Sequence, residues 1–260
     1  MDQPNAIWTA DFKGQFKTGD GIYCYPLTIL DGYSRFLLAC QALPSTSHSG
    51  AQPVFERLFR EFGLPLIIRT DNGIPFATQA IHRLSRLQVW WIKLGIIPEL
   101  IQPGRPDQNG RHERFHRTLK AGTARPPSTH LRAQQRRFDR FRTEYNEVRP
   151  HEALDQNPPA SAYHPSPSPY PDPVPPVEYP AHFELRYVSK NGGIRWGHGW
   201  VNMSRVLVGE YVGLEEVDDG IWSVYFGPLL IGRFDERNLT LYGCHPYNNR
   251  GKKVSPMFPV

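Results

Sequence analysis

A proline-rich segment divides the sequence and limits what each side of it can form. From Pro165 to Pro180, eight of the sixteen residues are proline. Proline lacks a backbone N–H and its ring fixes φ, so this stretch excludes a helix and favours extended polyproline geometry. We therefore predict a first domain at 1–164, a linker at 165–180, a second domain at 181–247 and a tail at 248–260.

The composition provides for a real core and favours a polyanionic partner. With 39% hydrophobic and 12% aromatic residues, a chain of 260 residues can form one large domain or two smaller ones. Thirty Lys and Arg against twenty-five Asp and Glu give a formal charge of +5, which attracts polyanions.

Cysteine usage and the first residues indicate the compartment. Cys24, Cys40 and Cys244 are too few and too scattered for a disulfide framework or a CxxC metal clip, which fits a reducing environment. The start, MDQPNAIWTA, has no signal peptide, and no run of about eighteen apolar residues predicts a membrane span. We expect a cytoplasmic protein without membrane contact.

The first domain reads as an initial strand meander followed by alternating strands and helices. β-branched and aromatic runs predict strands at 7–13, 22–30, 34–41, 66–68 and 96–101, with a hairpin turn at Asp31-Gly32. Helical periodicity predicts helices near 54–62, 78–95, 108–122 and 131–148. This order indicates an α/β fold in which helices cover a mixed sheet.

The second domain reads as a small all-β barrel. A strand pair is predicted at 183–196 around Asn191-Gly192-Gly193, and short strands punctuated by glycines follow at 200–233. Its Trp196, Trp200 and Trp222 can stack on nucleic-acid bases, although burial inside the barrel is the better interpretation.

Three carboxylates are individually ordinary and jointly informative. Asp11 lies in a predicted strand, where an edge position explains it, and Asp71 follows a buried strand in what can be a plain Asp-Asn-Gly turn. Glu113 lies on a basic helix. Phosphodiester chemistry uses such a set, because carboxylate oxygens hold hard divalent cations that assist the attacking and leaving oxygens.

Basic residues surround the third carboxylate and continue onto the next helix. Asn109, His116, Arg117 and Lys120 lie within about 60° of Glu113 around the helix axis, and we take them as candidate DNA contacts. On the following helix the candidates are Arg132, Arg136 and Arg140, with Arg137 and Arg142 beside them. A solvated helix face is the alternative for both sets.

The motifs around these carboxylates resemble those of DDE transposases and retroviral-type integrases. The matching segments are 8–12 (WTADF), 70–73 (TDNG) and 108–114 (QNGRHER), supported by 30–35 (LDGYSR) and 145–154 (YNEVRPHEAL). Asp71 and Glu113 are 42 positions apart, a spacing similar to that of integrase-like bacterial insertion-sequence transposases. The resemblance covers about residues 5–163.

This resemblance implies a fold, a reaction and partners. It implies a ribonuclease-H-like mixed sheet covered by helices, followed by a small SH3-like barrel. Asp11 would bridge two Mg2+ ions, for which Mn2+ substitutes, while Asp71 and Glu113 each complete one coordination shell. The implied protein cleaves element ends and transfers them into target DNA as a homo-oligomer, in the bacterial cytoplasm or nucleoid.

Two alternatives remain at this point. The family usually carries a helix-turn-helix region before the catalytic domain, and none precedes Asp11 here, so we expect that region to be lacking and keep a non-catalytic DNA-binding remnant as an alternative. His112 to His116 also reads HExxH, the zinc motif of metalloproteases. The surrounding arginines oppose a dication there, which makes this a distant alternative.

Overall fold

The structure is a computed structural model that describes residues 2–12, 14–78, 83–102 and 110–242, apart from the side chains of 110–113. The chain forms two compact units: residues 1–78 with 93–175, and residues 79–92 with 176–260. The predicted tail at 248–260 lies outside the described residues.

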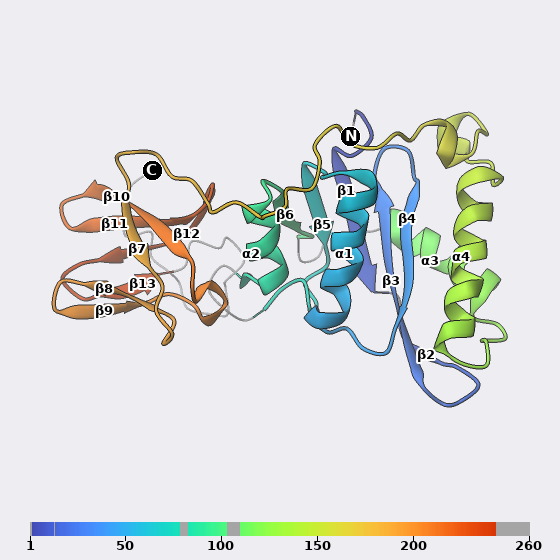
Figure 1. Cartoon of the computed structure of the whole chain (residues 1–260), viewed down its shortest axis with the longest axis horizontal. Coiled ribbons are helices and arrows are strands. Elements are labelled where there is room, and N and C mark those ends of the chain that lie inside the picture. Colours follow the sequence, from blue (N-terminus) through green and yellow to red (C-terminus); the bar gives the residue numbers. More distant parts are fainter. Residues whose placement is uncertain (1, 13, 79–82, 103–109, 243–260) are drawn as a thin grey trace. The chain divides into compact units, whose positions relative to one another are not determined.

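One mixed sheet organises the described part of the first unit (Figure 1). Its strands are β1 (Ile7–Phe12), β2 (Phe16–Lys17), β3 (Tyr23–Asp31), β4 (Leu37–Leu43), β5 (Ile67–Thr70) and β6 (Ile97–Leu100). The order is β4-β3-β1-β5-β6, with β2 paired to β3. β3 is antiparallel to β1 and β4, whereas β1, β5 and β6 run parallel. The predicted mixed sheet is confirmed.

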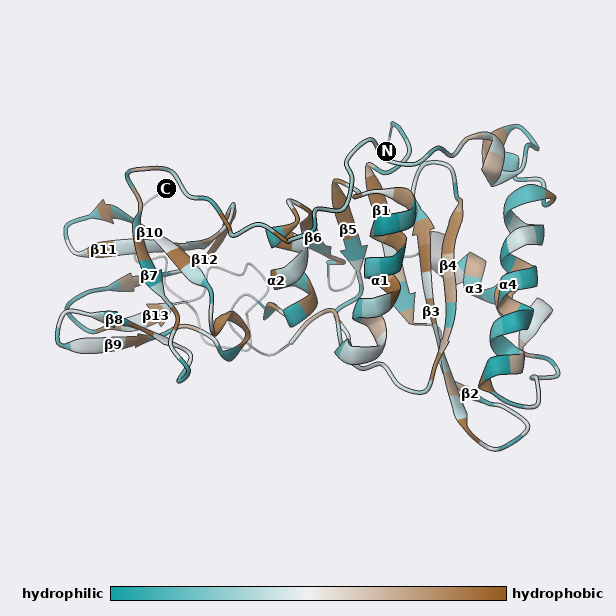
Figure 2. Ribbon diagram, in the orientation of Figure 1, coloured by the Kyte–Doolittle hydropathy of each residue, from teal (hydrophilic) through white to brown (hydrophobic). Residues whose placement is uncertain are grey.

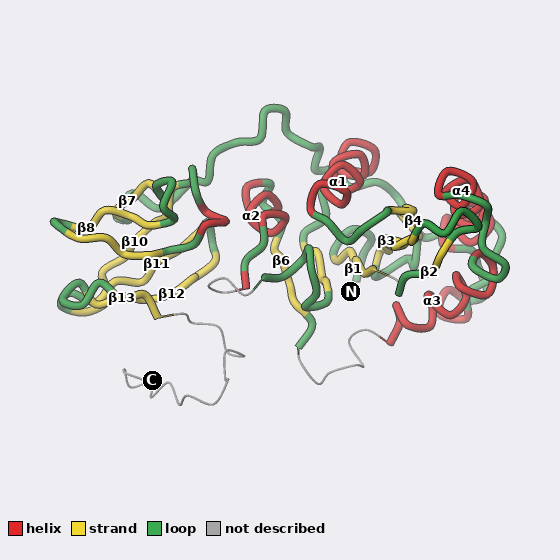
Figure 3. Tube along the Cα trace, turned by 90° about the horizontal axis from the view of Figure 1, so that it is seen from below, coloured by secondary structure: helices red, strands yellow, loops and turns green. Residues whose placement is uncertain are grey.

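Helices cover both faces of this sheet (Figure 3). α1 (His48–Phe62) begins at Ser47, whose hydroxyl accepts from the Gly50 N–H, and packs on one face, where the Phe59 ring stacks on Trp8 at 5.8 Å. α3 (Gly110–Thr123) covers the other face. Its Phe115 and Leu119 join a buried cluster with residues of β3, β4 and the next helix. The predicted helix covering is therefore present.

α4 (Leu131–Glu147) runs along the outer edge of β4 and pairs with its backbone. Three α4 side chains hydrogen-bond this edge: Gln135, Arg142 and Asn146. Asn146 is bidentate, because its Oδ1 accepts from the Leu37 N–H at 2.8 Å and its Nδ2 donates to the Leu37 carbonyl at 3.0 Å. An edge strand that would otherwise expose unpaired backbone groups is thereby closed.

Two elements start later than their sequence pattern predicts. α2 covers Arg86–Lys93, not 78–95, because Ser85 and Gln88 form a capping box: the Ser85 hydroxyl accepts from the Gln88 N–H, and the Gln88 side chain accepts from the Ser85 N–H. Residues 79–82 lie outside the described part. β4 begins at Leu37, because Ser34 is held in the turn by the Asp31 carboxylate.

The described part of the second unit is built on β strands. One sheet has the order β13-β12-β11-β10-β7 and a two-stranded sheet pairs β8 with β9. The strands are β7 (Glu184–Tyr187), β8 (Gly193–Trp196), β9 (Gly199–Asn202), β10 (Tyr211–Asp218), β11 (Ile221–Phe226), β12 (Leu229–Asp235) and β13 (Thr240–Tyr242). The predicted all-β character is confirmed, but within these residues the strands do not close into a barrel.

The strand pairing around Asn191-Gly192-Gly193 differs from the prediction. β7 pairs with β10 and β8 pairs with β9, so the strands on either side of this turn are not partners of each other. The turn itself forms, with the Gly192 N–H bonded to the Ser189 carbonyl at 2.8 Å. Gly192, at φ 85°, then turns the chain toward β9, where the Met203 N–H bonds to the Gly192 carbonyl.

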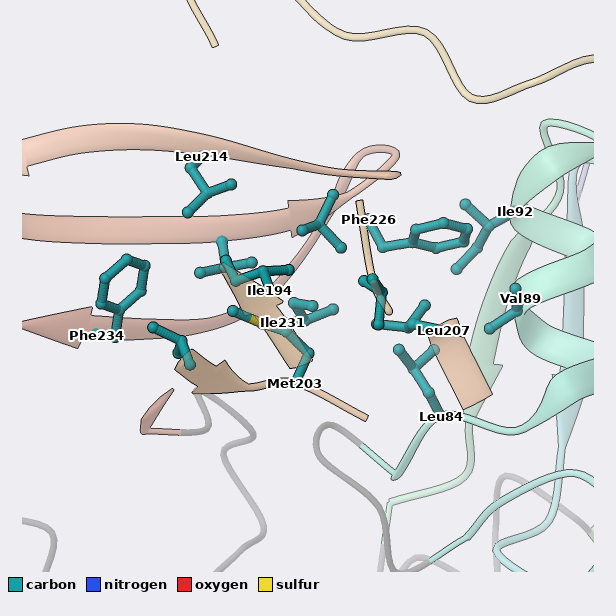
Figure 4. Packing of buried hydrophobic residues seen from close by; sticks show 14 residues of the cluster. Leu84, Val89, Ile92, Ile194, Met203, Leu207, Leu214, Phe226, Ile231 and Phe234 are labelled. Carbon is teal, nitrogen blue, oxygen red and sulfur yellow. The ribbon is translucent and has the colours of Figure 1, made fainter. Parts of the chain in front are cut away.

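The second unit also takes in a segment that lies between two strands of the first unit in the sequence. Leu84, Val89 and Ile92 belong to the same buried cluster as Leu207 and Phe226 (Figure 4). A Cβ on Gly227 would lie only 2.8 Å from the Ile92 Cγ2, which shows how closely α2 approaches this turn. From the sequence, residues 79–92 are predicted to belong to the first domain, because they lie far upstream of the proline segment.

Hydropathy follows this arrangement. Figure 2 shows the strands of the first unit mostly brown and α4 mostly teal, with apolar residues facing the sheet. In the part of the chain that the structure describes, no helix is both long and apolar enough to cross a membrane.

Candidate active site

Asp11 faces the side of the sheet that α3 covers. Side chains alternate along a strand, so Trp8 and Ala10 point toward α1 and are buried, whereas Asp11 points the other way. Asp11 lies directly opposite Thr28 in the antiparallel β1–β3 pair. Directly opposed residues share a face, so Asp11 and Thr28 are neighbours beneath α3.

Asp71 lies beside Asp11 at the same edge of the sheet. β1 and β5 are parallel neighbours with Ala10 paired to Thr70. Asp11 is the next residue on β1, and Asp71 directly follows the end of β5. Neighbouring strands are about 4.8 Å apart, and residues in matching register share a face. The structure therefore brings these two predicted site residues together, at the carboxyl ends where α/β sheets commonly bind ligands.

The Asp-Asn-Gly turn holds the Asp71 carboxylate in place. Its Oδ1 accepts from the Gly73 N–H at 3.1 Å, and a Cβ at position 73 would lie 3.0 Å from Oδ2, so glycine leaves room for the carboxylate. Asn72 donates to the Ile101 carbonyl at 2.7 Å and ties the turn to the chain after β6. Burial raises the pKa of Asp71, partly offset by the Gly73 hydrogen bond.

Glu113 lies in the first turn of α3, and its side chain is outside the described part. One turn later, His116 is buried against the Asp11–Thr28 pair. Its Nε2 lies 2.8 Å from the Thr28 Oγ1, and its Nδ1 lies 3.9 Å from the Asp11 Oδ2. These contacts fix α3 over β1 and bring the turn that carries Glu113 to the same face of the sheet.

The candidate DNA contacts divide into buried and exposed residues. Asn109 lies outside the described residues, and His116 is buried and directed at Asp11. The remaining candidates are exposed: Arg117, Lys120, Arg132, Arg136 and Arg140.

Two neighbouring arginines instead hydrogen-bond backbone carbonyls. Arg137 donates to Gly122 and Pro126, and Arg142 donates to Leu38.

Asp31 is a structural residue, as the turn interpretation predicts. Its carboxylate is fully buried and accepts from the Asn5 N–H, the Ser34 N–H and the Ser34 hydroxyl at 2.6–2.7 Å. It pairs with Trp8, and this places it on the α1 side of the sheet, away from Asp11.

Thr28 and His116 are the residues near the site whose roles the sequence did not reveal. Thr28 reads as one more β-branched strand residue, and His116 as part of a basic helix face. The register of β1 with β3 sets Thr28 opposite Asp11, and a single sequence does not provide that register.

The donor set fits a hard divalent cation. Asp11 and Asp71 directly follow the paired residues Ala10 and Thr70, and Asp71 is partly withdrawn from water, where a nearby cation would favour its ionised form. Within the described side chains, no three His, Cys, Asp or Glu are grouped to hold a metal. The Glu113 carboxylate, expected to be the third ligand, is outside that set.

Comparison with known families gives a consistent result. Two models described as "Integrase core domain" match residues 1–106 and 94–159. The chain is 34% identical over 119 residues to the Gag-Pol polyprotein of baboon endogenous virus (strain M7), covering 46% of this chain and 6% of the polyprotein. It is 31% identical over 118 residues to the Pol polyprotein of radiation murine leukemia virus (strain Kaplan), covering 45% and 19%. The chain thus spans a small part of these relatives.

A solved structure shares the fold over most of the chain. A chain in the simian T-cell lymphotropic virus intasome, in complex with the PP2A regulatory subunit B56 gamma, superposes with a TM-score of 0.52 at 18% identity. The match covers 88% of this chain and 78% of that one. The mixed sheet and the helices that cover it define a ribonuclease-H-like fold. The chain belongs to the DDE transposase and retroviral-type integrase superfamily.

Proposed function

We propose that this protein is a divalent-metal-dependent DNA strand transferase whose site is Asp11, Asp71 and Glu113. The observation that carries the proposal is the register of β1 with β5, in which Ala10 pairs with Thr70, the residues directly before Asp11 and Asp71. His116 brings α3 to that face, and Glu113 is one turn away on the same helix. Membership in the integrase superfamily supports the same reaction class.

The residues divide the work of holding cations and reacting groups. Two Mg2+ ions, or Mn2+ in their place, would activate the attacking hydroxyl and offset charge on the phosphate. Asp11 and Asp71 from the sheet, with Glu113 from α3, would hold these ions. The Gly73 N–H orients Asp71, while His116 and Thr28 limit the movement of Asp11. Their preorganisation reduces the rearrangement needed during reaction.

We further propose that the substrates are element ends and a target duplex, and that the protein acts as a homo-oligomer in the bacterial cytoplasm or nucleoid. The 42-residue spacing between Asp71 and Glu113 supports an insertion-sequence transposase within the superfamily. The net charge of +5 supports a polyanionic substrate.

Strand cleavage and joining by the purified chain test this proposal. Labelled duplexes carrying the ends of the encoding element are incubated with a target plasmid in Mg2+ or Mn2+. We expect nicked and joined products with the unaltered protein, and none with Asp11→Asn, Asp71→Asn or Glu113→Gln. Glu61→Gln is the matched control, because Glu61 is an exposed carboxylate near the end of α1.

The alternatives give different results in the same assay. A chain that binds the duplex but yields no product with either metal is a non-catalytic DNA-binding remnant. Zinc-dependent peptide cleavage that needs His112 and His116 would support the HExxH protease and contradict a DNA reaction.

A further inference from the structure

A basic groove separates α3 from α4 in the first unit. It has a volume of about 730 Å³ and is open to solvent. Arg117 lines it from α3, and Arg137, Arg140, Phe141 and Glu144 line it from α4. Arg149, just after α4, completes the set. Of the residues that the structure describes, four arginines and one carboxylate line the groove.

Three of these arginines are available to a ligand. Arg137 is committed to the fold, because it donates to the Pro126 carbonyl at 2.6 Å and the Gly122 carbonyl at 3.0 Å. Arg117, Arg140 and Arg149 are exposed, and their side chains have no hydrogen bond or ion pair with any described residue. Unneutralised charge gathered in one groove favours a polyanion.

Packing between α3 and α4 shapes the groove. Its floor includes Phe141, which meets the edge of Phe115 with ring centroids 6.3 Å apart. A Cβ on Gly122 would lie 3.3 Å from the Phe141 ring, so glycine allows the two helices to approach. The loop that follows α3 is fixed by the fully buried Gln134, whose amide donates to the Thr123 carbonyl and accepts from the Ser128 N–H at 2.9 Å each.

The position of Arg117 connects the groove with the candidate active site. Arg117 follows Glu113 by four residues on α3, which places the two positions one turn apart on the same side of the helix. The arginines then continue onto α4 and beyond it. An extended phosphate chain matches this distribution better than a single small anion does.

We propose that the α3–α4 groove binds the phosphate backbone of a DNA strand through Arg117, Arg140 and Arg149; the choice of DNA as the polyanion rests on the proposed function. Guanidinium groups pair with phosphate in a bidentate manner. A second copy of this chain fits less well, because its α3 and α4 would bring the same positive charge. Glu144, at the groove, repels phosphate and weakens binding.

DNA binding by groove and control variants tests this proposal. Affinity of the full chain for a labelled duplex of unrelated sequence is measured by fluorescence anisotropy over a range of KCl concentrations. We expect Arg117→Ala, Arg140→Ala and Arg149→Ala each to weaken binding several-fold and to lower the slope of log Kd against log[KCl] by about 0.9. Arg57→Ala and Arg60→Ala are the controls, because both residues are exposed on α1, which covers the other face of the sheet and does not line the groove.

A gain of affinity provides a second readout. Among the described residues that line the groove, Glu144 is the only carboxylate, so we expect Glu144→Gln to bind DNA more tightly, a result that misfolding does not produce. Equal effects of groove and control arginines, unchanged affinity in all variants, or no binding by the unaltered protein would overturn the proposal. A change in sedimentation without a change in DNA affinity would assign the groove to self-association instead.

The groove and the proposed function fail separately. If the unaltered protein cuts and joins DNA while groove variants bind normally, the groove proposal is wrong and the reaction stands. If no cutting occurs but groove variants lose affinity as expected, the groove stands and the reaction is wrong.

Discussion

At the scale of single residues, His116 connects α3 with the sheet. The Thr28 Oγ1 lies 3.1 Å from the Asp11 carbonyl and 2.8 Å from the His116 Nε2. When the hydroxyl donates to Nε2, the imidazole Nδ1 carries the proton that faces the Asp11 carboxylate. Replacing a residue that orients a metal-binding carboxylate typically lowers metal affinity about 10–100-fold.

We therefore predict different effects for two substitutions of His116. The Asn side chain places an N–H near the position of the imidazole Nδ1, so His116→Asn keeps a donor for Asp11. His116→Leu keeps bulk but no donor. We expect the Leu variant to need at least about ten-fold more Mg2+ for half-maximal strand cleavage, and the Asn variant to stay near the unaltered protein. Equal metal requirements for both would contradict a role in positioning Asp11.

We expect the buried Asp71 carboxylate to lower the stability of the folded protein when no metal is bound. Burial raises its pKa in the folded protein, so the folded state holds this proton to higher pH than the unfolded chain does. The stability from the protonated form is present at low pH and is lost as pH rises through the raised pKa. Without metal, Asp71→Asn should then melt a few degrees higher near pH 7 and equally near pH 3.

Thermal melts in EDTA at several pH values measure this difference. Asp11→Asn, measured in parallel, shows whether removing the other aspartate of the site changes the Tm in the same way. A lower Tm for Asp71→Asn at neutral pH would mean that the Gly73 hydrogen bond outweighs the cost of burial.

At the scale of elements, side chains of α4 hydrogen-bond the free backbone edge of β4, as a further strand would. The residues Gln135, Arg142 and Asn146 recur at seven- and four-residue intervals, so they lie along one side of the helix. That side meets β4 with amide and guanidinium groups rather than apolar contacts alone. The motif at 145–154 thus has a structural function at its second residue, because Asn146 pairs with both backbone groups of Leu37.

We predict that Asn146→Ala is strongly destabilising. It leaves the Leu37 N–H and carbonyl without partners at a fully buried residue, at a cost of about 1–3 kcal/mol for each group. Urea unfolding measures the loss. Thr143→Ala is the control, because Thr143 is exposed on the same helix and bonds only within it. Similar losses in the two variants would show that helix propensity, not the strand edge, determines the effect.

The elements were predictable from the sequence where the signal is local. The hydrophobic pattern gave the strands at β1, β3 and β5 to within a few residues, and with them the positions of Asp11 and Asp71. The capping box at Ser85 and Gln88 was readable but outweighed by the longer apolar pattern around it. Pairing was not readable: β7 with β10, and Thr28 beneath His116, depend on register between distant segments.

At the scale of the whole molecule, the core of the second unit contains residues from two distant parts of the sequence. Leu84, Val89 and Ile92 come from one part, and Val201, Phe226 and their neighbours from the other. Such a core is completed only when both are present. The proline segment therefore marks a boundary in composition, whereas the boundary in packing also includes residues 79–92.

We predict that a cavity in this core loosens α2. Phe226→Ala removes a fully buried ring, which costs about 3–5 kcal/mol, so amide exchange should rise over residues 86–92 together with β10 to β12. Phe59→Ala, in the core of the first unit, should raise exchange in α1 and β1 instead. Hydrogen exchange measured by mass spectrometry compares the two. Unchanged exchange over 86–92 in Phe226→Ala would show that the stability of α2 does not depend on that core.

The division of residues between the units has a consequence for how such proteins recombine. The backbone passes from one unit to the other three times, near residues 78, 92 and 175. A chimera joined only within 165–180 would therefore combine one parent's α2 with the other parent's β strands. Exchange of the second unit between relatives requires residues 79–92 to be inherited with it, which links two separate stretches of the gene.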